Sequence, residues 1–170
     1  MRPILLASLA AAACSRAPAR PHGQDGPAGA PPSGPTQPPA PAPTATITLA
    51  GARGAAVVHA EVVRSPGRIQ KGLMYRKFLA DDAGMLFLMG EVDDHHFWMR
   101  NTLIPLDIMF ISEDLRVVGI LENVQPLDET SRGVGAPSLY VLEVNGGWAQ
   151  AHGVAAGTQA TFAGVDAAAQ

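Results

Sequence analysis

The sequence predicts an α+β domain that is mainly antiparallel β, a small curled sheet or barrel with one principal helix. Short runs rich in Val, Ile, Leu and Phe alternate with acidic or glycine-containing turns along most of the chain. Only one stretch, residues 65–76, combines a helix start with helical spacing of its apolar residues. The chain has 170 residues, of which 47% are hydrophobic, and this is enough for one ordinary domain.

The predicted strands are short and separated by turns. They are residues 56–64, 84–89, 97–100, 106–112, 115–122, 139–144 and 159–162. Glu113 and Asp114 suit a tight hairpin between two of these strands. Residues 146–152 are expected to form one further helical turn.

The principal helix is expected to begin with Ser65 as N-cap and Pro66 in the first helical position. It should run to about Arg76. The residues of its buried face are then Ile69, Gly72, Leu73 and Arg76. A glycine on that face would let the helix approach the sheet closely.

The first 14 residues are typical of an export signal. Arg2 gives a positive start, and residues 4–13 form an apolar stretch that is too short to span a bilayer. The stretch ends in small residues before Cys14, which resembles the cleavage and lipidation site of bacterial lipoproteins. We expect lipid attachment at Cys14, and ordinary cleavage with release is the alternative.

Eleven of the 15 prolines lie in residues 1–43, which separates a tether from the domain. Residues 15–46 contain too few large apolar side chains to offset the entropy of ordering, and they are expected to be a disordered tether. We assign the globular domain to residues 47–163 and a disordered tail to residues 164–170.

Charge and cysteine content exclude several classes of protein. The formal net charge is −3 and the pI about 5.9, so a basic surface for nucleic acid is not expected. Cys14 is the single cysteine, which excludes an intrachain disulfide and a cysteine-built zinc site.

The middle of the domain carries a resemblance to a known family. The matching segments are residues 72–76 (GLMYR), 84–87 (GMLF), 97–102 (FWMRNT), 104–108 (IPLDI) and 141–143 (VLE) followed by Gly146. Residues 57–162 resemble the bacterial and archaeal family of domain of unknown function number 192. The resemblance implies a compact, mainly β domain that is often exported, and it implies no established activity.

Two carboxylates stand alone on apolar strands. Asp107 is the only polar residue of residues 106–111, and Glu143 shares its face with Leu139 and Val141. A buried carboxylate is paired, hydrogen-bonded or protonated. Arg76 and Arg64 are the expected partners, because arginine holds carboxylates bidentately. The cluster is either a buried ion-pair network or a recognition site for an anionic ligand.

Polar residues also follow the aromatic run. Asn101 and Thr102 either shape a turn or orient a ligand beside Trp98 as an apolar wall. His95 and His96 follow two aspartates and are weak metal candidates, since adjacent strand residues point to opposite faces.

The sequence shows no nucleophile elbow, zinc-protease, phosphate-loop or dinucleotide motif, and no cofactor is expected. We therefore expect an extracytoplasmic binding or interaction module in the cell envelope or periplasm. A lipid would tether it to a membrane, and its partner would be an unknown small molecule or envelope protein. One alternative is a small hydrolase-like envelope enzyme that uses Asp107 and Glu143. Another is a structural envelope protein with an exposed apolar patch.

Overall fold

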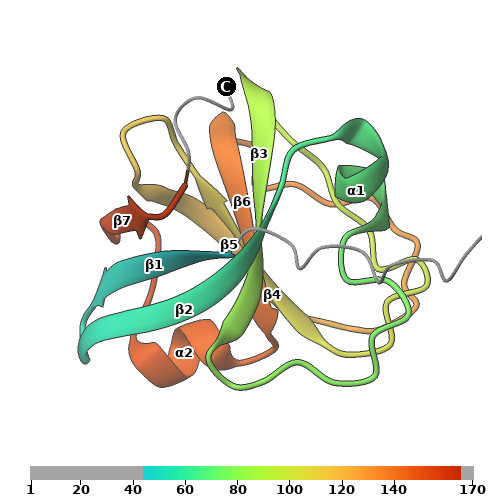
Figure 1. Cartoon of the computed structure of the whole chain (residues 1–170), viewed down its shortest axis with the longest axis horizontal. Coiled ribbons are helices and arrows are strands. Elements are labelled where there is room, and N and C mark those ends of the chain that lie inside the picture. Colours follow the sequence, from blue (N-terminus) through green and yellow to red (C-terminus); the bar gives the residue numbers. More distant parts are fainter. Residues whose placement is uncertain (1–43, 166–170) are drawn as a thin grey trace, which may run out of the picture. The chain divides into compact units, whose positions relative to one another are not determined.

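The computed structural model describes residues 44–165, which form one sheet of seven strands with two short helices. The strands are β1 (Thr44–Gly51), β2 (Gly54–Val63), β3 (Ala83–Asp93), β4 (Leu106–Ile111), β5 (Val117–Val124), β6 (Ser138–Asn145) and β7 (Ala160–Ala163). The helices are α1 (Pro66–Lys71) and α2 (Trp148–His152). The strands lie in the order β5-β4-β6-β3-β2-β1-β7, with β3 at the centre (Figure 1). The expected α+β class and the predominance of β structure are confirmed.

The sheet is mixed, because β2 and β3 are hydrogen-bonded neighbours that run in the same direction. A tight turn can join antiparallel strands, whereas a parallel pair needs a crossover of a dozen or more residues. Residues 64–82 supply that crossover and include α1. The expectation of a mainly antiparallel sheet is therefore corrected to a mixed one.

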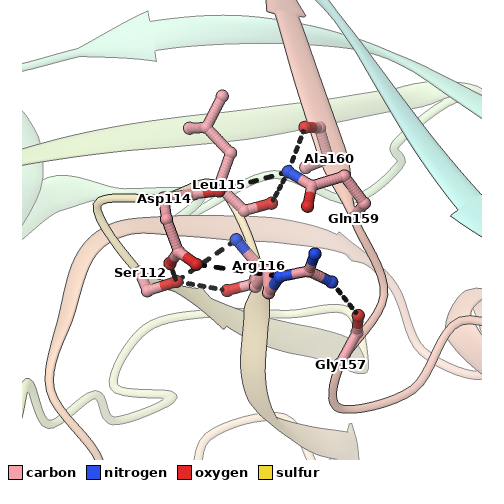
Figure 2. A network of polar contacts seen from close by, with 7 residues as sticks. All are labelled: Ser112, Asp114, Leu115, Arg116, Gly157, Gln159 and Ala160. Carbon is pink, nitrogen blue, oxygen red and sulfur yellow. Dashed lines mark hydrogen bonds and ion pairs between the residues drawn. The ribbon is translucent and has the colours of Figure 1, made fainter.

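The two edge strands, β5 and β7, approach each other without closing the sheet. A single bridge joins Arg116 to Gln159. Figure 2 shows the polar contacts that the two side chains make around it. Gln159 Nε2 donates to the carbonyl oxygens of Asp114 and Leu115 at 3.1 and 3.0 Å. Arg116 Nη1 donates to the carbonyl oxygen of Gly157 at 3.2 Å. Within residues 44–165 this contact stays an isolated bridge, so the expected barrel is not formed.

Both faces of the central strands are covered by apolar side chains. The first core contains Val58, Leu86 and Leu142 and includes the α2 residue Trp148. The second core contains Phe87 and Phe110 and lies beside α1 and the long loops, with Leu73 among its members. All six residues of β4 are buried for this reason. A polar side chain on β4, or in the buried part of β6, consequently enters one core or the other.

Helix α1 is shorter than expected. Ser65 and Pro66 start it as predicted, but it ends at Lys71. Gly72 follows with a φ of 46° and a ψ of −133°, a conformation that glycine adopts far more readily than other residues. Gly72 and Arg76 therefore lie beyond the helix, and the expected helical face is wrong from Gly72 onward.

Two other segments differ from expectation. Residues 97–100 form no strand and contribute one bridge, from Phe97 to Arg132. The sheet begins at Thr44, slightly before the expected start of the domain. Among the described residues, neither helix is long and apolar enough to cross a membrane.

The remaining terminal expectations concern residues that the structure does not describe. They are the signal segment of residues 1–14, lipid attachment at Cys14, the tether up to residue 43 and the tail from residue 166.

Candidate functional site

Glu143 is a buried acid in the middle of the sheet. It lies on β6, with Met85 of β3 and Ile108 of β4 as its register partners. Since these neighbours belong to the second core, the Glu143 side chain enters that core. Its exposed fraction is 5%, and its Oε2 has no hydrogen-bond partner among the residues described.

The environment of Glu143 favours the neutral acid. Burial raises the pKa of the Glu143 carboxyl to about 8, and the positive charge of Arg76 opposes this shift. At neutral pH the carboxyl is therefore mostly protonated, so it can donate a hydrogen bond. A carboxylic acid held neutral in an apolar site is a recurrent feature of functional sites.

The carboxyl lines a pocket of about 210 Å³, which we call the inner lobe. Its lining residues are Ile69, Gln70, Lys71, Gly72, Leu73, Met74, Met89, His96, Phe97, Trp98, Thr102 and Glu143. Gly72 helps to keep this space open, because a Cβ there would lie 3.6 Å from Oε2 of Glu143 and 3.4 Å from the Phe87 ring. The lobe is an apolar enclosure with a few polar groups.

A second hollow of about 290 Å³ adjoins the inner lobe, and we call it the outer lobe. Its lining residues are Gly67, Gln70, Lys71, Met74, Trp98, Arg100 and Asn101, four of which also line the inner lobe. Trp98 borders both lobes and is 41% exposed. The two lobes form one site that runs from the buried acid to a basic rim.

The three residues after the aromatic run occupy a turn and also line the site. Asn101 has a φ of 55°, and its carbonyl oxygen accepts from the Tyr75 N–H at 2.8 Å. Thr102 is buried, and its carbonyl oxygen accepts from the Leu127 N–H at 3.1 Å. Asn101 and Thr102 therefore shape a turn, which is one of the two roles expected for them, and the ligand-orienting role stays a prediction for residues that line the two lobes. Arg100 lies over the Trp98 ring at 5.8 Å from its centre.

Arg76 does not pair with Asp107. It forms two hydrogen bonds with Glu61 of β2, from Nη1 to Oε1 at 2.5 Å and from Nη2 to Oε2 at 2.8 Å. The hydrogen bond from Arg76 is the main reason that the Glu61 pKa is lowered. Arg76 therefore acts on Glu143 only through its charge, since its guanidinium is held by Glu61.

Asp107 is satisfied by the backbone, which corrects the expected ion pair with Arg76 or Arg64. Its Oδ1 accepts from the N–H groups of Asn123 at 2.7 Å and Gly147 at 2.9 Å. Its Oδ2 accepts from the Ala149 N–H at 2.8 Å. The side chain is fully buried. Asp107 thus joins β4 to β5 and to the start of α2.

Asp107 and Glu143 also lie on opposite faces of the sheet. Ile108, next to Asp107, is the register partner of Glu143, and side chains alternate along a strand. The two carboxyls therefore do not face each other across a cleft, as an acid–base pair would require.

Arg64 lies away from Glu143, in a hollow of about 500 Å³. That hollow is lined by Leu88, Met89, Gly90, Glu91, Val92, Glu113, Leu139, Tyr140 and Val165 besides Arg64. Its volume equals that of the two lobes together, but none of its lining residues carries a buried polar side-chain atom without a partner in the described structure. The two-lobed site is therefore the better candidate.

The histidine pair is placed in a loop. His95 Nε2 lies 3.1 Å from the Glu91 carbonyl oxygen, and His96 Nδ1 lies 3.0 Å from that of Asp94. Residues 44–165 contain no set of three His, Cys, Asp or Glu side chains arranged to hold a metal. His96 instead contributes to the inner lobe.

Sequence reasoning proposed four residues of the two-lobed site, namely Trp98, Asn101, Thr102 and Glu143. It missed Lys71, His96 and Arg100 as lining residues. Lys71 could have been found from its place beside the glycine that ends α1, because that glycine approaches Glu143.

Together, the fold and the site define a mixed-sheet domain with a buried acid at the end of a small pocket. The chain belongs to the family DUF192, whose description is "Uncharacterized ACR" and whose model matches residues 47–162. A search of curated proteins finds no match.

Two solved structures are similar to this chain. One is a protein of unknown function from Novosphingobium aromaticivorans DSM 12444, with 43% identity and a TM-score of 0.66 over 68% of this chain and 83% of that one. The other comes from Sinorhizobium meliloti 1021 and is described as a proposed transcription regulator. It has 36% identity and a TM-score of 0.68 over 72% of this chain and 95% of that one.

Proposed function

We propose that this protein is an extracytoplasmic, lipid-tethered binding module that takes a small molecule in the two-lobed site. The observation that carries the proposal is the buried Oε2 of Glu143, which borders the inner lobe and has no partner among the described residues. Buried polar atoms in proteins are almost always hydrogen-bonded. A ligand that supplies the missing partner accounts for this exception.

The composition of the site supports binding of a small molecule. Ligand sites are typically apolar enclosures with a few polar groups that fix orientation. Here Leu73, Phe97 and Trp98 supply apolar surface, and Glu143 and Thr102 supply polar groups. Binding is favoured over hydrolysis because Asp107, the other acid of the expected pair, enters the opposite face of the sheet.

The sequence supports the location. Residues 1–14 are typical of an export signal that ends at Cys14, and a Pro-rich stretch separates them from the first strand. The proposed module would thus be held at a membrane in the cell envelope or periplasm.

Tryptophan fluorescence tests the proposal, because the chain has two tryptophans on opposite faces of the sheet. Trp98 lines the site, whereas Trp148 is buried in the first core. The full-length protein is screened against anionic, neutral and cationic small molecules. We expect hits that change the emission of the wild type and of Trp148→Phe, and that leave the emission of Trp98→Phe unchanged.

The shift in melting temperature measures the same binding by a second method. Hits should raise the melting temperature of the wild type and of Leu103→Ala, a residue as exposed as Trp98 but outside both lobes. Trp98→Ala should weaken the shift. The proposal is abandoned if no compound in any charge class produces a response that depends on Trp98.

A further inference from the structure

The two lobes differ in charge, and this difference bears on the chemistry of the ligand. Glu143 lines the inner lobe alone, together with His96, Thr102 and apolar residues. Arg100 and Asn101 line the outer lobe alone, and Lys71 and Gln70 border both lobes. A molecule that fills both lobes therefore meets an acid at its inner end and positive charge at its outer end.

The rim cations have capacity for an anion. Lys71 forms no ion pair within residues 44–165. Arg100 lies over the Trp98 ring, and its one ion pair in the described residues is a long contact of 3.9 Å with Glu129, in which both side chains are more than half exposed. Such an exposed pair is weak and leaves the guanidinium available. Lys71 and Arg100 therefore both offer positive charge to an anionic group of a ligand.

The groups around Glu143 disfavour a cationic ligand. The positive charge of Arg76 acts on the carboxyl, and Lys71 and His96 line the same lobe. The β3 and β4 neighbours, Met85 and Ile108, are uncharged. An ammonium group would pass the basic rim and then meet further positive charge. A neutral oxygen acceptor, in contrast, fits a protonated carboxyl without an added charge.

We propose that the two-lobed site binds a small organic carboxylate, with its charged end beside Lys71 and Arg100 and an oxygen acceptor at its other end facing Glu143. The apolar middle of such a ligand would lie against Trp98, which borders both lobes. This inference rests on the proposed function, since it names the chemical class that the same site takes.

Three probes of one shape separate the parts of the proposal. Para-acetylbenzoate has both the carboxylate and the acceptor, para-acetylbenzamide lacks the charge, and para-isopropylbenzoate lacks the acceptor. Titration calorimetry on the full-length protein should show that para-acetylbenzoate binds at least about tenfold more tightly than either analogue, since each lacks a charge-assisted or buried hydrogen bond. If para-acetylbenzamide binds as tightly as para-acetylbenzoate or more tightly, the site does not select an anion. If para-isopropylbenzoate binds as tightly as para-acetylbenzoate, the site does not select an oxygen acceptor.

Two lysine variants test the outer end. Lys71→Gln should lower the affinity for para-acetylbenzoate and leave that for the amide unchanged. Lys77→Gln is the control, because Lys77 is exposed and lines neither lobe. An equal effect of both variants would mean that general charge attracts the probe, and the proposed contact with Lys71 would be wrong.

The pH dependence tests the inner end. Affinity of the wild type for para-acetylbenzoate should fall as pH rises through about 8, because Glu143 then loses its O–H donor and becomes negative. Glu143→Gln should keep its affinity across this range, since an amide N–H donates at every pH. Identical pH profiles for the two proteins would contradict the contact with Glu143.

Failure of this inference is distinguishable from failure of the proposed function. If other compounds bind in a Trp98-dependent manner while none of the three probes binds, the carboxylate class is wrong and the binding module stands. If no compound gives a Trp98-dependent response, both proposals fall.

Discussion

Asp107 and Glu143 are both buried carboxyls, yet their surroundings give them opposite effects on stability. Asp107 accepts three backbone N–H groups, so both of its carboxyl oxygens have hydrogen-bond partners. Glu143 has an unpaired Oε2 and a pKa raised by burial. One acid therefore holds the fold together, and the other is kept in the fold at a cost in stability.

The substitution Asp107→Asn should be strongly destabilising. The amide places an N–H₂ group against one of three backbone donors, which loses a charge-assisted hydrogen bond and leaves a buried donor unpaired. We expect a loss of about 2–4 kcal/mol in the free energy of unfolding. Urea denaturation measures it, with the exposed Asp82→Asn as control. Equal midpoints for the two variants would mean that the contacts of Asp107 contribute little.

Glu143→Gln should have the opposite effect, and only at higher pH. The folded protein keeps the Glu143 proton up to about pH 8, whereas the unfolded chain loses it near 4.5. The unfolded state is therefore favoured increasingly as pH rises between these values. The difference corresponds to about 4–5 kcal/mol at pH 8. The glutamine side chain does not titrate, so the variant lacks this destabilisation.

Melting temperatures of both proteins from pH 4.5 to 8 test this prediction. The two should agree at the acid end, and the variant should be more stable at the alkaline end. The comparison isolates Glu143 because both proteins share the other titrating groups. A variant less stable than the wild type at pH 8 would show that Glu143 is paired in its charged form.

At the scale of elements, the contact between the sheet edges combines three backbone hydrogen bonds, donated by the N–H groups of Val117, Gly157 and Ala160, with the hydrogen bonds of one side chain. Gln159 Nε2 donates to three carbonyl oxygens, those of Asp114, Leu115 and Ala160. These bonds attach the turn between β4 and β5 to the start of β7 (Figure 2). β7 has only four residues, and β1 is the one strand with which it pairs. The bonds of Gln159 therefore help to hold β7 in place.

The substitution Gln159→Ala should therefore loosen β7 first. We expect a loss of about 1–2 kcal/mol and faster amide exchange in residues 160–163, with little change in β3 and β6. Thr161→Ala, on an exposed position of the same strand, is the control. Faster exchange spread evenly over the whole sheet would contradict this local role.

The element boundaries also show what sequence alone could predict. Ser65 and Pro66 start α1 as expected, since capping is local. The end of the helix was missed because Gly72 fitted an apolar face as well as it fitted a C-cap with positive φ. The pairing of β2 with β3 was missed because strand direction is set by the crossover and not by the strands themselves.

The same limit applies to the site. Asp107 and Glu143 stood out because each is a polar residue on an apolar strand. Their partners could not be predicted, because Asp107 is bound by backbone groups from Asn123, Gly147 and Ala149, which only the tertiary fold brings together. Side-chain chemistry alone suggested arginine.

At the scale of the whole molecule, the proposed role depends on where the chain is held. Cys14 is the only cysteine, so lipid attachment has one possible thiol. Cells grown with a radioactive fatty acid should label the wild type and Ser15→Ala, and should not label Cys14→Ser. Labelling of Cys14→Ser, or of none of the three proteins, would remove the lipid tether from the proposal.

The place of β1 has a consequence for the time course of folding. Its inner neighbour, β2, begins three residues after β1 ends, whereas its outer neighbour, β7, begins more than a hundred residues later. During synthesis the first hairpin can form early, whereas the outer edge of β1 stays unpaired until residues 160–163 have been made. At typical rates of translation this delay is roughly 5–20 s. The nascent chain thus carries an open strand edge, a template for wrong pairing with other chains, until residues 160–163 have been made.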